Sequence, residues 1–167
     1  MVPPDVVLEP LSKEQAATLD NLTQLYAYDF SDQVPLDLNA SGRFDVSFGD
    51  DWWNNAGHAA FIIRVGGKLA GFALARKGSR VTGADDVMDV AEFFVARAFR
   101  GKKVGTIAAH ALFNAFPGRW EVRVHKTHMA ATNFWSHAIA AFLGHSIAGR
   151  DIVLDAKART LFEFERA

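Results

Sequence analysis

The chain has 167 residues, half of them apolar, and its charges nearly cancel to a formal net charge of −1. This composition predicts a single globular domain over residues 1–167 and excludes a disordered or fibrous chain. The absence of cysteine excludes disulfides, thiolate catalysis and cysteine-bound zinc, and near-neutrality provides no general attraction to nucleic acid or to an anionic membrane. We predict a soluble, cytoplasmic protein, because the N-terminus lacks a signal-peptide pattern and no apolar run approaches the ~20 residues of a membrane span.

The first predicted element is a helix over residues 12–28. Ser12 followed by Gln15 is typical of a capping box. Apolar residues continue at helical spacing: Ala16, Leu19, Leu22 and Leu25. The following segment, residues 29–55, contains six Asp against one Arg, and we interpret it as loop-rich with one short helix.

A hairpin and a central strand come next. The runs 59–65 and 68–76 are apolar and strand-like, and Gly66-Gly67 between them predicts a tight turn because both glycines can adopt positive φ. Residues 87–95 are nearly continuously apolar, which predicts a strand buried on both faces at the centre of the sheet.

The second half of the chain alternates helices and strands. A helical stripe is formed by Val104, Ile107, Ala108, Ala111, Leu112 and Ala115. We predict a strand over 120–125, an amphipathic helix over 131–142, and closing strands over 146–154 and 159–165. This order predicts an α/β fold with a mixed, mostly antiparallel sheet, in which residues 87–125 form the parallel strand–helix–strand unit.

The turn before the first of these helices is unusually basic. Four cations fall within seven residues: Arg97, Arg100, Lys102 and Lys103. Cations at a helix N-terminus oppose the helix dipole, so this arrangement favours a bound anion such as pyrophosphate, held by backbone N–H groups. The alternative is a solvated basic turn without a ligand.

This stretch resembles motif A of the GNAT family of N-acetyltransferases, in which V-x-P ends a strand and [RQ]-x-x-G-x-[GA] opens a helix. Val95, Arg100 and Gly105 occupy the matching positions, while Arg97 replaces the proline and Lys103 replaces the inner glycine. The family's second helix often reads N-x-x-A-x-x-F-[YW], and residues 128–135 (HMAATNFW) are similar to it.

The resemblance implies an acyl-CoA N-acyltransferase fold with a β-α-β-α core and acetyl-CoA as co-substrate. It implies that Phe94 and Val95 at the strand end hydrogen-bond the pantetheine arm as an added strand would. It also implies that the turn binds the pyrophosphate, through Arg100, Gly101, Lys102, Lys103, Val104, Gly105 and Thr106. Phe134 and Trp135 of the second helix are expected to pack against the cofactor arm or the core.

Acetyl transfer to an amine requires a neutral nitrogen, and therefore a base. Glu92 is the first candidate, because burial within an apolar strand would raise its pKa. The alternatives are that Glu92 faces outward or pairs with an arginine such as Arg123; Asp89 is a weaker candidate base. Without cysteine, the resemblance implies direct transfer in a ternary complex and not an acetyl-cysteine intermediate.

The family often has a tyrosine acid in the second helix, but the matching residue here is Trp135, whose indole N–H is not a working acid. His137 and His128 are candidate replacements, with a structural role as the alternative. His125 and His128 form an HxxH pair without a clearly spaced third ligand, so we predict no metal site.

The acceptor is expected to be a small-molecule or peptide amine. Asp50, Asp51, Trp52 and Trp53 would attract a cationic amine, or else form a solvated acidic loop with a buried tryptophan pair. We expect a monomer or homodimer that binds neither nucleic acid nor membrane. Two other hypotheses remain: a catalytically silent acyl-CoA sensor or partner-binding module of the same fold, and a nucleic-acid contact at the basic turn.

Overall fold

The computed structural model describes residues 4–167, which form one seven-stranded sheet in the order β1-β2-β3-β4-β5-β7-β6. Its strands are β1 (Val6–Pro10), β2 (His58–Val65), β3 (Lys68–Lys77), β4 (Val87–Val95), β5 (Gly118–His125), β6 (Arg150–Leu154) and β7 (Lys157–Arg166). The neighbouring strands are antiparallel except for β4 and β5. The predicted mixed, mostly antiparallel α/β fold is thus confirmed.

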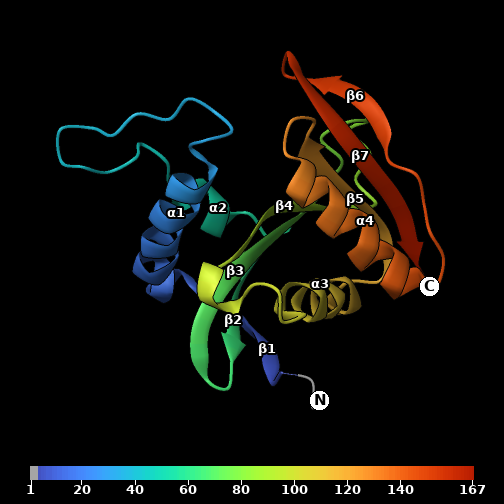
Figure 1. Cartoon of the computed structure of the whole chain (residues 1–167), viewed down its shortest axis with the longest axis horizontal. Helices are drawn as coiled ribbons and strands as arrows, with labels where there is room; N and C mark the ends of the chain where they lie inside the picture. The colour runs from blue at the N-terminus through green and yellow to red at the C-terminus, as the bar shows by residue number, and fades with distance from the viewer. Residues whose placement is uncertain (1–3) are drawn as a thin grey trace.

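The helices lie in two layers on either side of the sheet, as Figure 1 shows. They are α1 (Ala16–Phe30), α2 (Asp50–Asn54), α3 (Val104–Ala115) and α4 (Met129–Leu143), with 3-10 turns at Lys13–Gln15 and Arg97–Phe99. On one face α1 and α2 cover β2, β3 and β4; on the other, α3 and α4 pack against the sheet.

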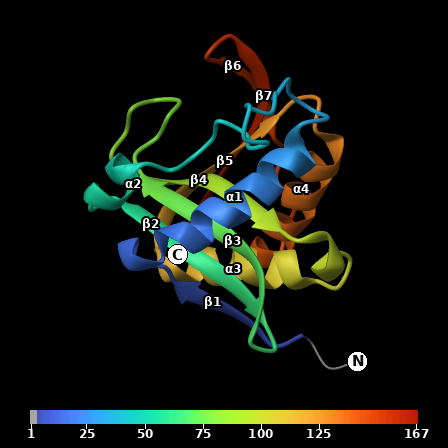
Figure 2. The ribbon, with the colours of Figure 1, turned by 90° about the vertical axis from the view of Figure 1, so that its left-hand side faces the viewer.

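Helix α1 lies diagonally across β3 and β4 in Figure 2. Leu19 and Leu22 are buried against the sheet as the spacing predicts, but Leu25 is 55% exposed. At 3.6 residues per turn the buried stripe continues through Tyr26, which packs against the same cluster as Leu22. The predicted helix therefore exists, but its inward face turns toward Tyr26 and away from Leu25.

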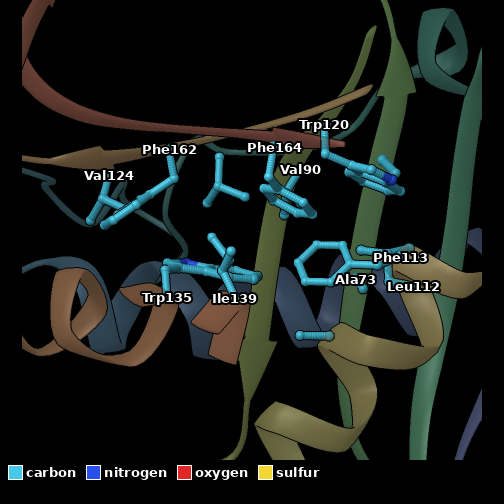
Figure 3. Packing of buried hydrophobic residues seen from close by; sticks show 13 residues of the cluster. Ala73, Val90, Leu112, Phe113, Trp120, Val124, Trp135, Ile139, Phe162 and Phe164 are labelled. Atoms are coloured by element: carbon cyan, nitrogen blue, oxygen red, sulfur yellow. The ribbon is translucent and has the colours of Figure 1, made fainter. Parts of the chain in front are cut away.

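The opposite layer contains a large aromatic core (Figure 3). Phe113 of α3 and Trp135 of α4 meet β-strand residues such as Trp120 and Phe164 there, and ring pairs such as Phe113–Phe164 lie 4.9 Å apart in edge-on geometry. This core fixes α3 and α4 on the sheet and so determines where their N-termini lie.

The connections agree with the prediction in part. Gly66 and Gly67 both have positive φ (54° and 78°) and join β2 to β3, as the hairpin requires. Strand β6 begins at Arg150 and not at residue 146, and the edge strand β1 was not predicted. No helix among residues 4–167 has the length and apolarity needed to cross a membrane.

Candidate active site

The two parallel strands at the centre of the sheet separate along their length. Pairing of β4 with β5 runs from Val87–Arg119 to Val90–Val122 and then stops, although β4 continues to Val95 and β5 to His125. The sheet is therefore open between the C-terminal halves of these strands. In open α/β sheets, ligands bind at the carboxyl ends of strands in such a crevice.

The main chain at the end of β4 faces this opening at alternate residues. Ala96 N–H donates to Ala70 O on β3, and the direction of the main-chain N–H and C=O groups alternates along a strand. The N–H and C=O of Phe94 therefore also point to β3. Those of Phe93 and Val95 point the other way, into the opening. Of the two strand-end residues predicted to bind a pantetheine arm, only Val95 directs its main chain there. The Phe94 ring packs on the α1 side, 5.8 Å from Tyr26.

Backbone amides of α3 line the mouth of the opening. The N–H groups of Val104, Gly105 and Thr106 occupy the first turn, where a helix provides no acceptor. Within residues 4–167 the N-cap Lys103 makes no capping side-chain bond to them. Gly101 and Lys103 have positive φ (73° and 63°), a geometry typical of anion-binding backbone concavities.

Helix α3 approaches α4 closely at this mouth. A Cβ on Gly105 would lie 3.0 Å from Phe134 Cε2, so any side chain here would press on the Phe134 ring and force it to shift. Phe134 packs against Phe93 with ring centroids 5.9 Å apart, and Trp135 is buried beside both residues. Phe134 and Trp135, which were predicted to pack against the cofactor arm or the core, thus both pack in the core between α3, α4 and the sheet.

One carboxylate of α1 connects to the basic turn. Asp29 accepts hydrogen bonds from Arg97 Nε at 2.9 Å and from Arg100 Nη2 at 2.6 Å, while Arg100 Nε donates to Val95 O at 2.7 Å. Burial alone would raise the pKa of Asp29, but the two arginines outweigh burial and hold that pKa below its ordinary value. Lys102 donates to Ala98 O, 3.1 Å away, and the four turn residues 100–103 are exposed.

A β-bulge places Glu92 on the α1 face of β4. Leu74 of β3 pairs with Glu92 and Ala75 with Val90, so Ala91 is the extra residue. Val90 points into the α3–α4 core, and without the bulge Glu92 would point the same way. The bulge reverses the alternation, and Glu92 meets α1 instead.

Glu92 binds a tyrosine that sequence reasoning missed. The Tyr26 hydroxyl donates to Glu92 Oε2 at 2.7 Å. Burial raises the pKa of Glu92, and the Tyr26 hydrogen bond with the charges of Arg76 and Arg123 offsets only part of this effect. Burial, together with the Glu92 charge, raises the pKa of Tyr26 well above its usual value, so Tyr26 remains a donor.

Asp89 is occupied elsewhere. It is fully buried and accepts hydrogen bonds from Arg76 Nε at 2.8 Å and from Arg123 Nε and Nη2 at 3.0 and 2.8 Å. Arg123 therefore neutralises Asp89, and Glu92 is left with Tyr26 as its hydrogen-bond partner. Of the two candidate bases, Asp89 is held by arginines, whereas Glu92 lies on the part of β4 beyond its pairing with β5, and burial raises the pKa of Glu92.

The histidines are separated by the structure. His137 lies exposed on α4 with its Nδ1 2.7 Å from its own helix at Asn133 O. His128 is the N-cap of α4 and accepts from Ala131 N–H at 2.9 Å. His125 and His128 both pack against Phe30 of α1, with ring centroids 5.4 and 5.8 Å away. In the part of the chain that the structure describes, no three His, Asp or Glu side chains gather as a metal site would require.

The acidic segment lies over the other half of the sheet. Trp52 is buried and stacks on His58 with ring centroids 4.3 Å apart, as expected if this tryptophan belongs to the core and does not bind an acceptor. The exposed Asp50 pairs with Lys13 at 3.1 Å. A cavity of about 340 Å³ lies here beside Trp53, and another of about 270 Å³ lies near Glu121 and Ser79. Neither cavity is lined by Glu92.

A sheet opened between two parallel strands, with the first-turn amides of a helix at its mouth, defines the acyl-CoA N-acyltransferase class of fold. The chain belongs to the GNAT acetyltransferase family, because the model of the "Acetyltransferase (GNAT) family" matches residues 20–141. A search of curated protein sequences finds no match.

Solved structures agree with this assignment at the level of fold. An acetyltransferase from Thermus thermophilus is similar with a TM-score of 0.68 and 13% identity, over 96% of each chain. A spermidine N-acetyltransferase from Vibrio cholerae gives 0.61 and 10%, over 96% of this chain and 93% of its own. Arabidopsis thaliana NAA60, solved in complex with acetyl-CoA, gives 0.59 and 10%, over 96% and 98%.

Sequence reasoning missed the contribution of α1 to this site. One face of α1 carries three residues at spacings of three and four. Tyr26 contacts β4, Asp29 contacts the basic turn, and Phe30 contacts the end of β5. Their i, i+3, i+4 spacing is visible in the sequence. Their partners are not, because those contacts join residues more than 60 positions apart.

Proposed function

We propose that this protein is an N-acetyltransferase that moves the acetyl group of acetyl-CoA directly to an amine acceptor in a ternary complex. The observation that carries the proposal is the position of Glu92: a carboxylate with raised pKa, bound by Tyr26, on the strand that borders the opening. Family membership supports acyl-CoA chemistry, and the position of Glu92 gives that chemistry a base.

The residues present fit an acyl-CoA. Pyrophosphate would bind the free N–H groups of Val104, Gly105 and Thr106, with the exposed cations of the turn adding favourable charge. The pantetheine arm would lie along β4 and use the main chain of Phe93 and Val95 in place of the missing strand partner. The Val95 carbonyl is held by Arg100, so the Val95 N–H and the Phe93 groups are the ones that remain for this contact.

The reaction balances without any further reactant. An ammonium acceptor gives one proton to Glu92, directly or through water, and its nitrogen attacks the thioester carbonyl. A C–N bond forms, the C–S bond breaks, and the CoA thiolate leaves with the sulfur electron pair. The second N–H proton then passes from the nitrogen to the thiolate through water, which gives the amide and free CoA thiol. A thiol pKa near 8.5 makes this thiolate a competent leaving group without an acid, which is consistent with Trp135 being buried in the core where the family often has tyrosine.

Two measurements on the purified full chain test the proposal. Acetyl-CoA, CoA and ATP are titrated in a thermal-shift assay, where a ligand at 100-fold over its Kd should add about 2.7 kcal/mol of stability. Free thiol release is then followed with a panel of amines, and the absence of cysteine means that the protein contributes no thiol of its own. If CoA stabilises the protein but no amine causes thiol release, the hypothesis of a silent acyl-CoA-binding module remains. If CoA has no effect on stability, both the transferase and the silent module are rejected.

A further inference from the structure

One arginine beside the proposed site has no anionic partner. Within residues 4–167 the Nε–H of Arg159 is shielded from solvent yet has no hydrogen-bond acceptor. No ion pair in this part of the chain includes Arg159, whereas Arg76 and Arg123 bind Asp89 and Arg80 lies 3.8 Å from Asp155. A guanidinium stays protonated, so a buried N–H without an acceptor is costly unless a ligand supplies one.

Arg159 lies on the same face of the sheet as Glu92. It pairs with His125 across β5 and β7, and directly opposed residues of an antiparallel pair share a face. His125 packs on Phe30 of α1, and Glu92 binds Tyr26 of the same helix, so all of these side chains are on the α1 face. Strand β5 alone separates β7 from β4 in the sheet.

The neighbourhood of Arg159 contains charges of both signs. Burial lowers the pKa of Arg159 and the nearby charges of Arg123 and Arg80 lower it further, while Asp155 and Glu92 act in the opposite direction without reversing the shift. Burial lowers the pKa of His125 too, and Arg159 and Lys157 add to this effect. An anion placed here would therefore meet Arg159, a cation without an ion-pair partner, on the face of the sheet that carries the proposed base.

We propose that Arg159 binds a carboxylate of the acceptor, so that the substrate is a small molecule with both an amine and a carboxylate, such as a free amino acid, and not a polyamine. This inference rests on the proposed function. The amine would lie at Glu92 and the carboxylate on the α1 face of β7, where a guanidinium can bind its two oxygens together. The segment 31–49 and the β6–β7 hairpin both project at this end of the molecule in Figures 1 and 2, and would flank such a substrate.

The test compares matched acceptors. The common L-amino acids, β-alanine and γ-aminobutyrate are each assayed for thiol release beside their carboxamides, their decarboxylated amines and, where these exist, their phosphonate analogues. Spermidine serves as the polyamine. We expect at least one amino acid to exceed its carboxamide by about tenfold to a hundredfold in kcat/KM, the range for a hydrogen bond between charged groups. A phosphonate preferred over its carboxylate would overturn the carboxylate assignment.

Variants assign the effect to Arg159. Arg159→Met should remove the preference for carboxylate over carboxamide, mainly through KM, with a much smaller loss for the carboxamide, which carries no charge; Arg159→Lys should restore part of the preference. Arg119→Met is the matched control, because it removes an exposed cation that has its own partner, Asp86, at the other end of β5. Equal losses for carboxylate and carboxamide in Arg159→Met would overturn the inference.

The outcomes separate the two proposals. Turnover of spermidine or of the carboxamides, with no gain from a carboxylate, rejects the inference and keeps the N-acetyltransferase. No thiol release from any amine rejects the N-acetyltransferase itself. In either case acetyl-CoA must stabilise Arg159→Met as much as it stabilises the wild type, since Arg159 lies outside the turn that is proposed to bind the cofactor.

Discussion

The hydroxyl of Tyr26 donates to Glu92 Oε2 over 2.7 Å and joins the first helix to the central strand. Sixty-six residues separate the two in sequence. This bond both orients the carboxylate and opposes the rise in its pKa that burial causes. The Tyr26–Glu92 pair therefore sets the pH range in which the proposed base is ionised.

Tyr26→Phe should move the acidic limb of the pH profile upward. Activity requires the Glu92 carboxylate and declines as pH falls through the pKa of Glu92; without the tyrosine donor this pKa is higher. We expect kcat/KM at pH 7 to fall roughly tenfold, the scale of one hydrogen bond to a charged group. The kcat/KM profile from pH 5 to 9 measures both effects. Tyr28→Phe is the control, since Tyr28 is 69% exposed, and an unmoved limb in Tyr26→Phe would contradict the assignment.

Glu92→Gln should separate catalysis from stability. Loss of a general base lowers kcat by about 10²–10⁴-fold. The folded-state pKa of Glu92 lies above its unfolded value, so any stability that Glu92 contributes is present at acidic pH and lost as pH rises through the folded pKa. Glu92→Gln should thus be at least as stable as wild type at pH 7, with this advantage disappearing toward pH 4. Urea unfolding at both pH values and acetyl-CoA thermal shifts check this; a Glu92→Gln variant with full activity would remove the base.

Lys103→Gly should stabilise the protein. Lys103 has φ of +63°, a region that costs a non-glycine residue about 1 kcal/mol and costs glycine nothing. The expected rise in Tm is about 3 °C for a chain of this size, and acetyl-CoA affinity should fall only by the contribution of one exposed cation, because the amides are unchanged. Lys102→Gly is the matched control: it removes an adjacent exposed lysine without positive φ and should bring no such gain.

Gly105→Ala should weaken cofactor binding through packing. The new methyl would lie 3.0 and 3.2 Å from ring carbons of Phe134, so the ring or the first turn of α3 must shift by a few tenths of an ångström, and we expect this shift to disturb the first-turn amides. Overpacking of this kind costs about 1–3 kcal/mol, and the acetyl-CoA thermal shift should shrink. The double variant Gly105→Ala/Phe134→Leu should recover part of both losses. A normal acetyl-CoA response in Gly105→Ala would show that these amides do not hold the diphosphate.

Asp29→Asn should destabilise the protein relative to wild type, and this loss of stability should be larger at neutral pH than at acidic pH. Arg97 and Arg100 hold the folded-state pKa of Asp29 below its ordinary value, so its contribution is present above the unfolded pKa near 3.9 and is lost as pH falls through the folded pKa. Chemical unfolding at pH 7 and pH 3 measures the difference between the variants. A difference that is equal at both pH values would mean that the Asp29 charge is not responsible. Exposed Asp32→Asn provides the control.

The sequence predicted those parts that depend on local chemistry. Gly66 and Gly67 encode a turn whatever surrounds them, and the apolar run 87–95 identifies the central strand. The bulge at Ala91 has no sequence signature, because alanine fits both a regular strand and a bulged one. Arg159 was missed for another reason: its isolation is visible only when every neighbouring arginine has been matched to a carboxylate. The first helix was predicted, but Leu25 was assigned to its buried stripe. From Leu22, a spacing of three residues leads to Leu25 and a spacing of four leads to Tyr26, and both spacings fit a helix.

The unpaired Ala91 has a consequence for how this chain tolerates change. A point replacement there alters one small side chain, but loss of the residue would turn Glu92 half a rotation about the strand, toward the aromatic core and away from the acceptor. Over evolutionary time the position should thus accept many substitutions and no deletion. The count of residues between Val90 and Glu92, more than their identity, keeps the carboxylate on the side where a substrate amine can reach it.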